Sequence, residues 1–461
     1  MTASFSVKRN GRVYTPSFLV KIILNFGGYR GQNVLQKHVM DNSCGDGAFL
    51  VEIVRRYCIA SYGRLGQELR EDLGTFIHGI EIDSEECEKT RRNLDAAVRE
   101  FGIGSVDWDV RCADTLSCFA DYQSKMDFVF GNPPYVRIHH LAVVNDVKKF
   151  SFSRKGMTDL FIAFFEIGFD MLSDNGTMAL ITPSSWLNSA SGENLRAYIR
   201  KSGCLDGFMD LEHFQPFEAM TYTIVSRFVN KKRMRKIEYF TLSGKEKPKF
   251  VDNLFLEDME IGGCFYLAKR DELCELRKIL ENSKQSNIQV KNGFATLADK
   301  LFILPVDCEN KLDLIKASTG KWKQCIFPYD PKGRPIPFEN LGEKTKKYFL
   351  EHRNEFSTHG DGDWYLFGRS QGLKDVCKDK IAINSIVKDV ASVKLNFVPK
   401  GKGVYGGLYI IGMNSFEEIR NVVCCDEFFR YVKALKKYKS GGYYTFSSKD
   451  LQKYLTFKLG D

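Results

Sequence analysis

The segment GNPPY (131–135) combines residue types that could bind and activate a planar amine. The successive prolines Pro133 and Pro134 remove two backbone N–H donors and fix two φ angles. They hold the carbonyl groups of Asn132 and Pro133 outward as rigid acceptors, and the Asn132 amide adds a third acceptor. Tyr135 offers a flat face beside them. We interpret the segment as a site that accepts the protons of an NH₂ group while its ring stacks; the alternative is a plain proline turn.

Acidic residues end three successive predicted strands, at Asp41, Glu81 and Asp114. The carboxyl ends of parallel strands meet at one edge of a sheet, where α/β proteins bind ligands. Asp41 would accept hydrogen bonds from a ligand ammonium, Glu81 from two ribose hydroxyls and Asp114 from an adenine amine. In DNSCGDG (41–47), small residues would let the backbone approach this ligand, and the helix that follows offers free N–H groups. Taken singly, each acid could be an ordinary carboxylate at a strand end.

Apolar strand-like runs alternate with helix-like runs in the first half of the chain. This alternation predicts βαβ units and therefore an α/β fold, a parallel sheet with helices on both faces. Strands are predicted at 39–43, 76–82, 106–114, 126–132, 177–183, 205–211 and 222–229. Helices are predicted at 47–60, 84–101, 159–173 and 191–202. Asp83 is predicted to be the N-cap of the second of these helices.

The alternation stops at the charged segment KKRMRK (231–236), so we predict two domains, 1–235 and 236–461. A length of 461 residues suits two or three domains. From residue 231 onward, 42 Lys and Arg stand against 30 Asp and Glu, a net charge of +12. The preceding residues have a net charge of −3. A basic half indicates a polyanionic partner, with a solvated basic surface as the alternative.

The composition excludes several classes of protein. Hydrophobic residues make up 43% of the chain and charged residues 27%, which excludes a mostly disordered protein. No apolar run approaches the roughly 20 residues of a membrane span, so no membrane partner is expected. The 13 cysteines include no C-x-x-C pair. We therefore expect neither a disulfide framework nor a metal site, and reduced thiols fit a cytoplasmic protein.

Together, these motifs resemble the S-adenosylmethionine-dependent DNA adenine-N6 methyltransferases of restriction–modification systems. In the subgroup concerned, a target-recognition domain follows the catalytic domain. The family's Tyr-Thr-Pro segment is matched at 14–16, its [DNS]PP[YFW] motif at 132–135, and its helix of small and aromatic residues at 159–166. Asn42 and Ser43 depart from the family pattern, because proline and alanine are frequent at these positions. The resemblance implies a Rossmann-like seven-stranded methyltransferase sheet, followed by a mixed α+β DNA-recognition domain.

The resemblance has specific motifs over residues 10–230 and reaches weakly into the second half at 290–304 and 364–373. It implies no metal and a cofactor site for S-adenosylmethionine formed by Tyr14, Thr15, Pro16, Asp41, Cys44, Gly45, Glu81, Ile82, Asp114, Thr115, Asn132 and Phe164. The catalytic residues would be Asn132, Pro133, Pro134 and Tyr135. The target base would stack on Tyr135. Phe217 is either a further aromatic contact for this base or a core residue, and Phe214 is a second choice.

In the second half, basic residues interleave with aromatic ones at 347–353 and 431–446, which suits a surface facing a DNA groove. Arg369 could contact a base or a phosphate, or form a structural ion pair. The resemblance implies that the partner is double-stranded DNA with a specific short recognition sequence. A separate restriction endonuclease would act beside the enzyme. The chain would be a monomer or weak dimer in the cytoplasm of a bacterium, or would be encoded by a phage.

The implied function is that of a site-specific DNA methyltransferase, which flips an adenine out of the duplex and methylates its N6. Two alternatives stay open. One is an N-methyltransferase that acts on structured RNA or on a protein glutamine. Glutamine methyltransferases place a small helical domain before the sheet and end near it, whereas here about 38 residues precede the sheet and about 230 follow it. The other alternative is a non-catalytic DNA-binding protein, against which the complete set of motif residues argues.

Overall fold

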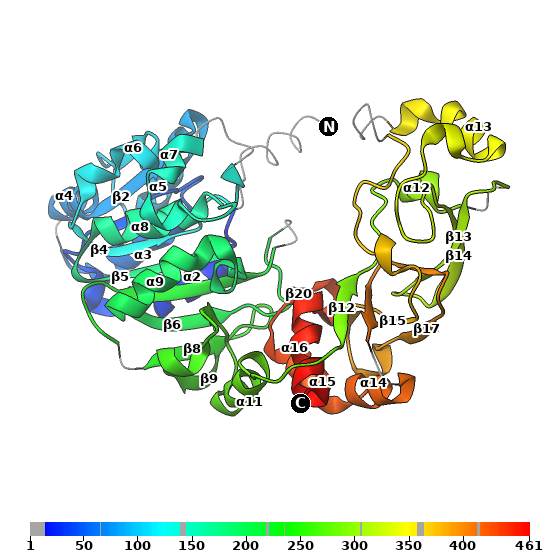
Figure 1. Ribbon diagram of the computed structural model, residues 1–461. Helices are drawn as coiled ribbons and strands as arrows, with labels where there is room; N and C mark the ends of the chain where they lie inside the picture. Colours follow the sequence, from blue (N-terminus) through cyan, green and yellow to red (C-terminus); the bar gives the residue numbers. More distant parts are fainter. Residues whose placement is uncertain are drawn as a thin grey trace. The chain divides into compact units, whose positions relative to one another are not determined.

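The chain forms two compact units, Met1–Leu273 and Cys274–Asp461. The computed structural model describes residues 14–64, 66–138, 144–217, 221–234, 236–304, 307–356, 364–412 and 415–461 (Figure 1). Within these residues, no helix combines the length and the apolar character needed to cross a membrane.

A nine-stranded sheet forms the centre of the first unit, in the order β3-β2-β1-β4-β5-β7-β6-β8-β9. Neighbouring strands are parallel from β3 through β5 and in the β6–β8 pair, whereas β7 runs antiparallel to β5 and β6, and β9 to β8. The strands are β1 (Val39–Asp41), β2 (Ile77–Glu81), β3 (Asp109–Cys112), β4 (Met126–Gly131), β5 (Leu172–Pro183), β6 (Leu205–Asp210), β7 (Thr223–Val229), β8 (Ile237–Thr241) and β9 (Lys249–Leu254). The α/β fold and the seven predicted strands are confirmed, and two further strands extend the sheet.

Helices cover both faces of this sheet. Successive strand residues point to opposite faces, and the apolar side chains on each face are buried under helices. In β1, for example, Val39 belongs to one hydrophobic cluster and Met40 to the other. Residues of α2, α3, α4 and α5 pack in the cluster of Val39, and residues of α8 and α9 pack in the cluster of Met40 (Figure 1). The helices of this unit are α2 (Ser17–Phe26), α3 (Ala48–Ala60), α4 (Gly66–Phe76), α5 (Ser84–Arg99), α6 (Thr115–Cys118), α7 (Val144–Lys148), α8 (Phe161–Met171), α9 (Glu193–Ser202) and α10 (Leu256–Met259). The short strands β10 (Glu260–Ile261) and β11 (Cys264–Phe265) form a separate pair.

The predicted domain boundary at residue 235 falls inside the first unit. The strand that follows β7 in the chain, β8, pairs with β6 in parallel. Tyr239 of β8 and Leu254 of β9 are buried in the same cluster as Met40. The burial of these apolar side chains assigns β8 and β9 to the first unit, which extends to Leu273.

The second unit is a mixed α+β structure built from three small sheets, whose strand orders are β12-β19-β15-β17, β14-β13-β18 and β16-β21-β20. Helix α11 (Arg270–Leu280) leads into it. Its strands are β12 (Gln289–Asn292), β13 (Lys311–Lys316), β14 (Lys321–Ile326), β15 (Lys380–Ile383), β16 (Ile386–Val387), β17 (Leu395–Val398), β18 (Gly403–Tyr405), β19 (Leu408–Ile411), β20 (Tyr438–Lys439) and β21 (Tyr443–Thr445). Its helices are α12 (Asp299–Phe302), α13 (Glu343–Glu351), α14 (Phe416–Val423), α15 (Asp426–Ala434) and α16 (Ser448–Leu459).

Candidate active site at the carboxyl edge of the sheet

The predicted site residues follow the carboxyl ends of four neighbouring parallel strands. In the sheet, β1 lies between β2 and β4, and β2 lies between β1 and β3. Asp41 and Glu81 end β1 and β2, Asp114 follows β3, and Asn132 follows β4. Because the chain leaves β1 toward β2 and returns to β4 on the other side, the strand order reverses at β1, and α/β sheets bind ligands at such a point.

The glycine-rich turn after β1 is hydrogen-bonded to the end of β2. The backbone N–H of Gly45 donates to Glu81 Oε2 at 2.9 Å, and the N–H of Asp83 donates to Glu81 Oε1 at 3.0 Å. Gly47 has a φ of 85° where α3 begins, and a Cβ built there would lie 3.0 Å from Thr90 Cγ2. The turn therefore needs glycine, and its hydrogen bond to Glu81 fixes the orientation of that carboxylate. Cys44 is buried beside it, and its N–H donates to the carbonyl of Ile80 at 3.0 Å.

Asp41 is almost completely buried, with 1% of its surface exposed. Burial raises the pKa of Asp41 to about 8; the nearby Glu81 and Asp46 carboxylates raise it further, whereas a hydrogen bond from the Ser43 N–H opposes the shift. A Cβ built on Gly131 would lie 3.0 Å from Asp41 Oδ1, so the carboxylate lies directly against the residue before Asn132. A cation bound beside this buried acid would favour the ionised form of its carboxyl group.

Replacing Asp41 with asparagine should raise the melting temperature of the ligand-free protein, and the gain should widen from about pH 5.5 to about pH 8. An unfolded aspartate ionises at about pH 4, but burial raises the pKa of Asp41 in the fold to about 8. Over this interval the folded state retains a proton that the unfolded state has lost, so rising pH favours unfolding of the wild type. Asparagine removes this effect. Scanning fluorimetry at several pH values would measure it, and a difference independent of pH would contradict the burial of an uncompensated carboxyl.

Beyond the two acids, the edge presents an apolar side chain and two helix starts. Ile82 is 68% exposed, although it is aliphatic and directly follows Glu81. Asp83 caps α5 by accepting from the N–H groups of Glu85 and Glu86, which confirms the predicted N-cap. Asp114 caps α6 by accepting from the Leu116 N–H at 3.0 Å. The hydroxyl of Thr115 donates to the carbonyl of Asn42 at 2.7 Å and ties this cap to the end of β1.

The Tyr-Thr-Pro segment lies against the GNPPY segment, although more than a hundred residues separate them. Asn132 Nδ2 donates to Thr15 Oγ1 at 3.1 Å. Pro16 is the N-cap of α2, and its carbonyl accepts from the N–H groups at the start of that helix. Tyr14 is partly exposed, and its hydroxyl donates to Glu86 Oε1 at 3.0 Å. The Asn132 amide is thereby held in one orientation beside β4.

Tyr135 is held by its hydroxyl and by two aromatic neighbours. The hydroxyl donates to the carbonyl of Ile181 on β5 at 3.1 Å, and burial raises the Tyr135 pKa far above its ordinary value. The rings of Phe161 and Phe217 each lie edge-on to Tyr135, with centroids 6.3 Å away. Phe217 is only 8% exposed and belongs to a core cluster, so the structure favours the core role for it. Phe214, the second choice, packs partly buried against the same cluster.

Sequence reasoning missed two features of this site. The sequence predicts Phe161 only as part of a helix, whereas in the structure its ring contacts Tyr135. Asn42 is fully buried, and no protein atom within the described residues hydrogen-bonds its amide. In the sequence, the one indication of this role is a polar residue at the end of a predicted strand. Phe164, predicted to contact the cofactor, is buried within α8.

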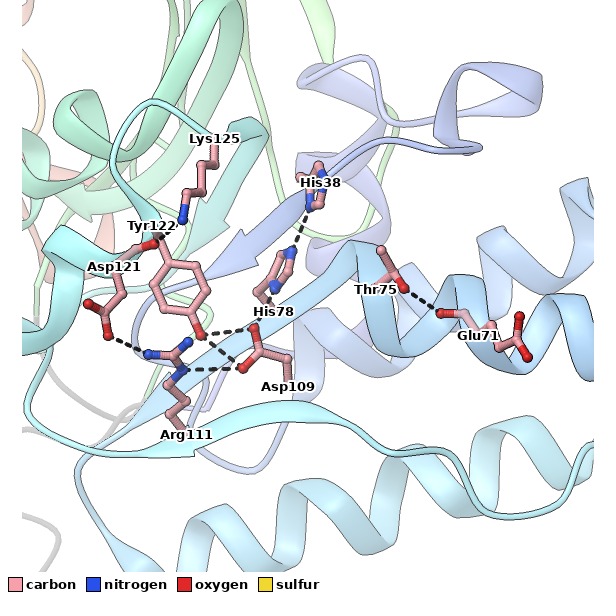
Figure 2. Close-up of polar contacts among 9 residues, drawn as sticks. All are labelled: His38, Glu71, Thr75, His78, Asp109, Arg111, Asp121, Tyr122 and Lys125. Atoms are coloured by element: carbon pink, nitrogen blue, oxygen red, sulfur yellow. Dashed lines mark hydrogen bonds and ion pairs between the residues drawn. The ribbon is translucent and has the colours of Figure 1, made fainter.

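A second polar network lies at the starts of β1, β2 and β3, the opposite end from the candidate site, and Figure 2 shows its side chains. His38 precedes β1, and its Nδ1 lies 2.9 Å from Nε2 of His78, near the start of β2. His78 Nδ1 lies 2.6 Å from Asp109 at the start of β3, which also accepts from Tyr122 and Arg111. The network joins three strand starts and two polar side chains. We assign it a structural role, because no group of three or more His, Cys, Asp or Glu residues in the described part of the chain is arranged so that it could hold a metal ion.

Comparisons with known proteins identify the family. A family profile described as Eco57I restriction-modification methylase matches residues 49–217. The Type II methyltransferase M.XhoI of Xanthomonas vasicola is 30% identical over 395 residues, covering 74% of this chain and 71% of its own length. The chain belongs to the Type II methyltransferases of restriction–modification systems.

One further relative and one solved structure resemble this Type II methyltransferase over most of its length. M.BstVI of Geobacillus stearothermophilus is 26% identical and aligns with 76% of this chain and 72% of its own. A solved structure of the Type IIL restriction–modification enzyme MmeI in complex with DNA superimposes with a TM-score of 0.64 at 13% identity. The superposition covers 96% of this chain and 64% of the MmeI chain. The MmeI likeness extends the agreement in fold to both units of the methyltransferase and confirms the expected order of a methyltransferase sheet followed by an α+β unit.

Proposed function

We propose that this Type II methyltransferase transfers a methyl group from S-adenosylmethionine to N6 of an adenine flipped out of double-stranded DNA at a specific short site. One observation carries the proposal. The buried Asp41 carboxylate lies against Gly131, and the amide of the next residue, Asn132, is oriented by Thr15. These contacts support a site for a cationic cofactor that would adjoin a set of acceptors for a planar amine.

The residues at the carboxyl edge fit S-adenosylmethionine, which supplies an electrophilic methyl group when bound. Asp41 would hold the ammonium group, whose positive charge would favour the ionised carboxylate. Both oxygens of Glu81 already accept one backbone N–H each, so the carboxylate is oriented to accept from two ribose hydroxyls as well. Ile82 supplies an exposed apolar surface for the cofactor adenine, with Asp114 as acceptor for its amine.

The GNPPY segment would bind the target base. The lone pair of adenine N6 is delocalised into the ring, so the amine is a weak nucleophile. Acceptance of its two protons by the Asn132 side chain and the Pro133 carbonyl would localise electron density on N6. N6 could then form a bond to the methyl carbon while the bond from that carbon to the sulfonium sulfur breaks, and S-adenosylhomocysteine would leave. The methylated amine would lose a proton to water afterward, so no strong base is needed first. Positioning and electrostatics would supply most of the acceleration.

An adenine amine inside a duplex cannot reach this edge, so the base must leave the stack. The second unit would provide the specific DNA contacts. Residues 274–461 contain 32 Lys and Arg against 22 Asp and Glu, whereas the first unit is close to neutral. The methylated site would be protected from a separate restriction endonuclease. Methyl transfer to structured RNA or to a protein glutamine is the competing proposal, and membership of the Type II methyltransferase family argues against it.

Mapping the modified base tests the proposal. The protein is incubated with S-adenosylmethionine carrying a deuterated methyl group and with unmethylated plasmid DNA, and the DNA is digested to nucleosides. We expect labelled N6-methyldeoxyadenosine at one short sequence by mass spectrometry and single-molecule sequencing. A label in cytosine would overturn the choice of base. A label only in added RNA or in protein would overturn the choice of DNA.

A further inference from the structure

In the first unit, a short exposed tip lies beside the chain that follows the GNPPY segment. The tip consists of residues 154–157 (RKGM), all of which are exposed. The next residue, Thr158, is buried, and its carbonyl accepts from the N–H of Ile138 at 3.3 Å. Ile138 follows Tyr135 by three residues, so the Cα atoms of these two residues lie at most about 11 Å apart. The RKGM tip therefore lies near the residues proposed to bind the target adenine.

The chain that leads into the RKGM tip is held in place by two helices. Glu166 of α8 accepts from the N–H and from the hydroxyl of Ser151, each at 3.0 Å. Asn194 of α9 donates to the carbonyl of Ser151 at 2.7 Å. Within the tip, Gly156 has a φ of 66°, a backbone conformation that favours glycine and turns the chain sharply. The tip is therefore a tight turn on an anchored base, and it presents its side chains outward.

An apolar side chain and two arginines come together at this tip. Met157 is 74% exposed, and Arg154 is exposed with one bond to the carbonyl of Lys149 at 3.2 Å. Arg137 is also exposed, and it forms an antiparallel bridge with Asp159, two residues after Met157. Within the described ranges, neither arginine forms an ion pair with a carboxylate. This combination matches duplex DNA, because apolar side chains wedge between base pairs while arginine contacts phosphate.

We propose that Met157 enters the DNA duplex where the target adenine leaves it and stabilises the flipped state, while Arg154 contacts a flanking phosphate. The proposal rests on the proposed function, because it assigns part of base flipping to the first unit itself. A flipped base stays attached to its strand, so the gap that it leaves in the stack lies close to the site that holds the base. An apolar side chain that fills this gap disfavours the return of the base. Met157 is a positioning residue, since it would touch the duplex and not the reacting atoms.

Met157→Ala should lower the single-turnover rate of methylation of a fully paired duplex at least about tenfold, with DNA binding within about threefold of the wild type. Placing the target adenine opposite an abasic site should restore the rate of this variant to within about threefold of the wild type, because an unpaired base costs less to flip. Met157→Leu should retain the wild-type rate, since leucine is an apolar side chain of similar volume. Arg154→Ala should weaken DNA binding and lower the slope of its salt dependence by about one.

Ile59→Ala is the matched control, because Ile59 is an apolar residue of the same unit that is 65% exposed in the last turn of α3. We expect the wild-type rate for this control. Met157→Ala should melt at the wild-type temperature, since substitution of an exposed side chain has little effect on stability. Equal losses on paired and abasic substrates, a lower melting temperature of Met157→Ala, or a similar loss in Met157→Leu or Ile59→Ala would each overturn the role of Met157. An unchanged salt slope in Arg154→Ala would overturn the phosphate contact. Failure of the wild type to methylate either duplex would instead overturn the proposed function.

Discussion

Replacing Asn132 with alanine should lower the rate of methyl transfer by at least about a hundredfold, while S-adenosylmethionine binds within a few-fold of the wild type. Removal of one preorganised polar group from an active site costs about 10²–10³ in rate. Asn132 is assigned to the target amine, and Asp41 and Glu81 are assigned to the cofactor. Single-turnover transfer of a radiolabelled methyl group measures the rate, and calorimetry measures cofactor binding.

Asn33→Ala is the matched control for this variant. Asn33 donates through its side chain to the carbonyl of Gly28 at 3.2 Å, before β1 and outside the carboxyl edge. The control should retain the wild-type rate. Near-normal turnover in Asn132→Ala would remove the amide from the mechanism. A large loss of cofactor affinity would instead indicate that the hydrogen bond from Asn132 to Thr15 supports the cofactor site.

Replacing Tyr135 with alanine should lower the rate about ten- to a hundredfold, whereas Tyr135→Phe should retain most of the activity. The expected loss matches the roughly 1–3 kcal/mol of one base–aromatic stacking contact. The phenylalanine ring would stay in place because Phe161 and Phe217 pack edge-on against it. Loss of the hydrogen bond to Ile181 should cost about 0.5–1.5 kcal/mol of stability.

The fluorescence of 2-aminopurine at the target position provides a second measurement for Tyr135. Its signal should rise as the base leaves the stack, and the alanine variant should hold the flipped base less stably with DNA binding retained. If Tyr135→Phe were as inactive as Tyr135→Ala, the hydroxyl would be the functional group. Its bond to the carbonyl of Ile181 would then be the feature to explain, and the stacking role would have to be abandoned.

Seven strands of the first unit could be predicted, because their segments are rich in apolar and β-branched residues and are bounded by turn residues. Helix α2 was missed, since SFLVKIILNF has almost continuous apolar character that fits a strand as well as a helix. Strands β8 and β9 were missed because IEYFT and KFVDNL are short and follow a charged turn. Their pairing with β6 is a long-range contact that no local pattern encodes.

The candidate site could be predicted as residue types at strand ends, but not as a set of interactions. The bond from Gly45 to Glu81 and the raised pKa of Asp41 depend on tertiary distances and burial. The same holds for Tyr135, whose edge-on neighbours come from α8 and from the segment before β7. The roles of the cofactor and base residues stay predictions until the variants are measured.

The outer strands β8 and β9 have a consequence for engineering chimaeras of these enzymes. A recognition module exchanged at residue 235 would remove β8 and leave the backbone donors and acceptors of β6 unpaired on one side. It would also uncover the cluster that contains Ile237, Tyr239 and Leu254. Such an open edge is a template for aggregation. A splice point beyond Leu273 keeps β8 paired with β6. Insolubility of a chimaera joined at 235 would therefore result from the exposed edge of β6 and not from the sequence specificity of the exchanged module.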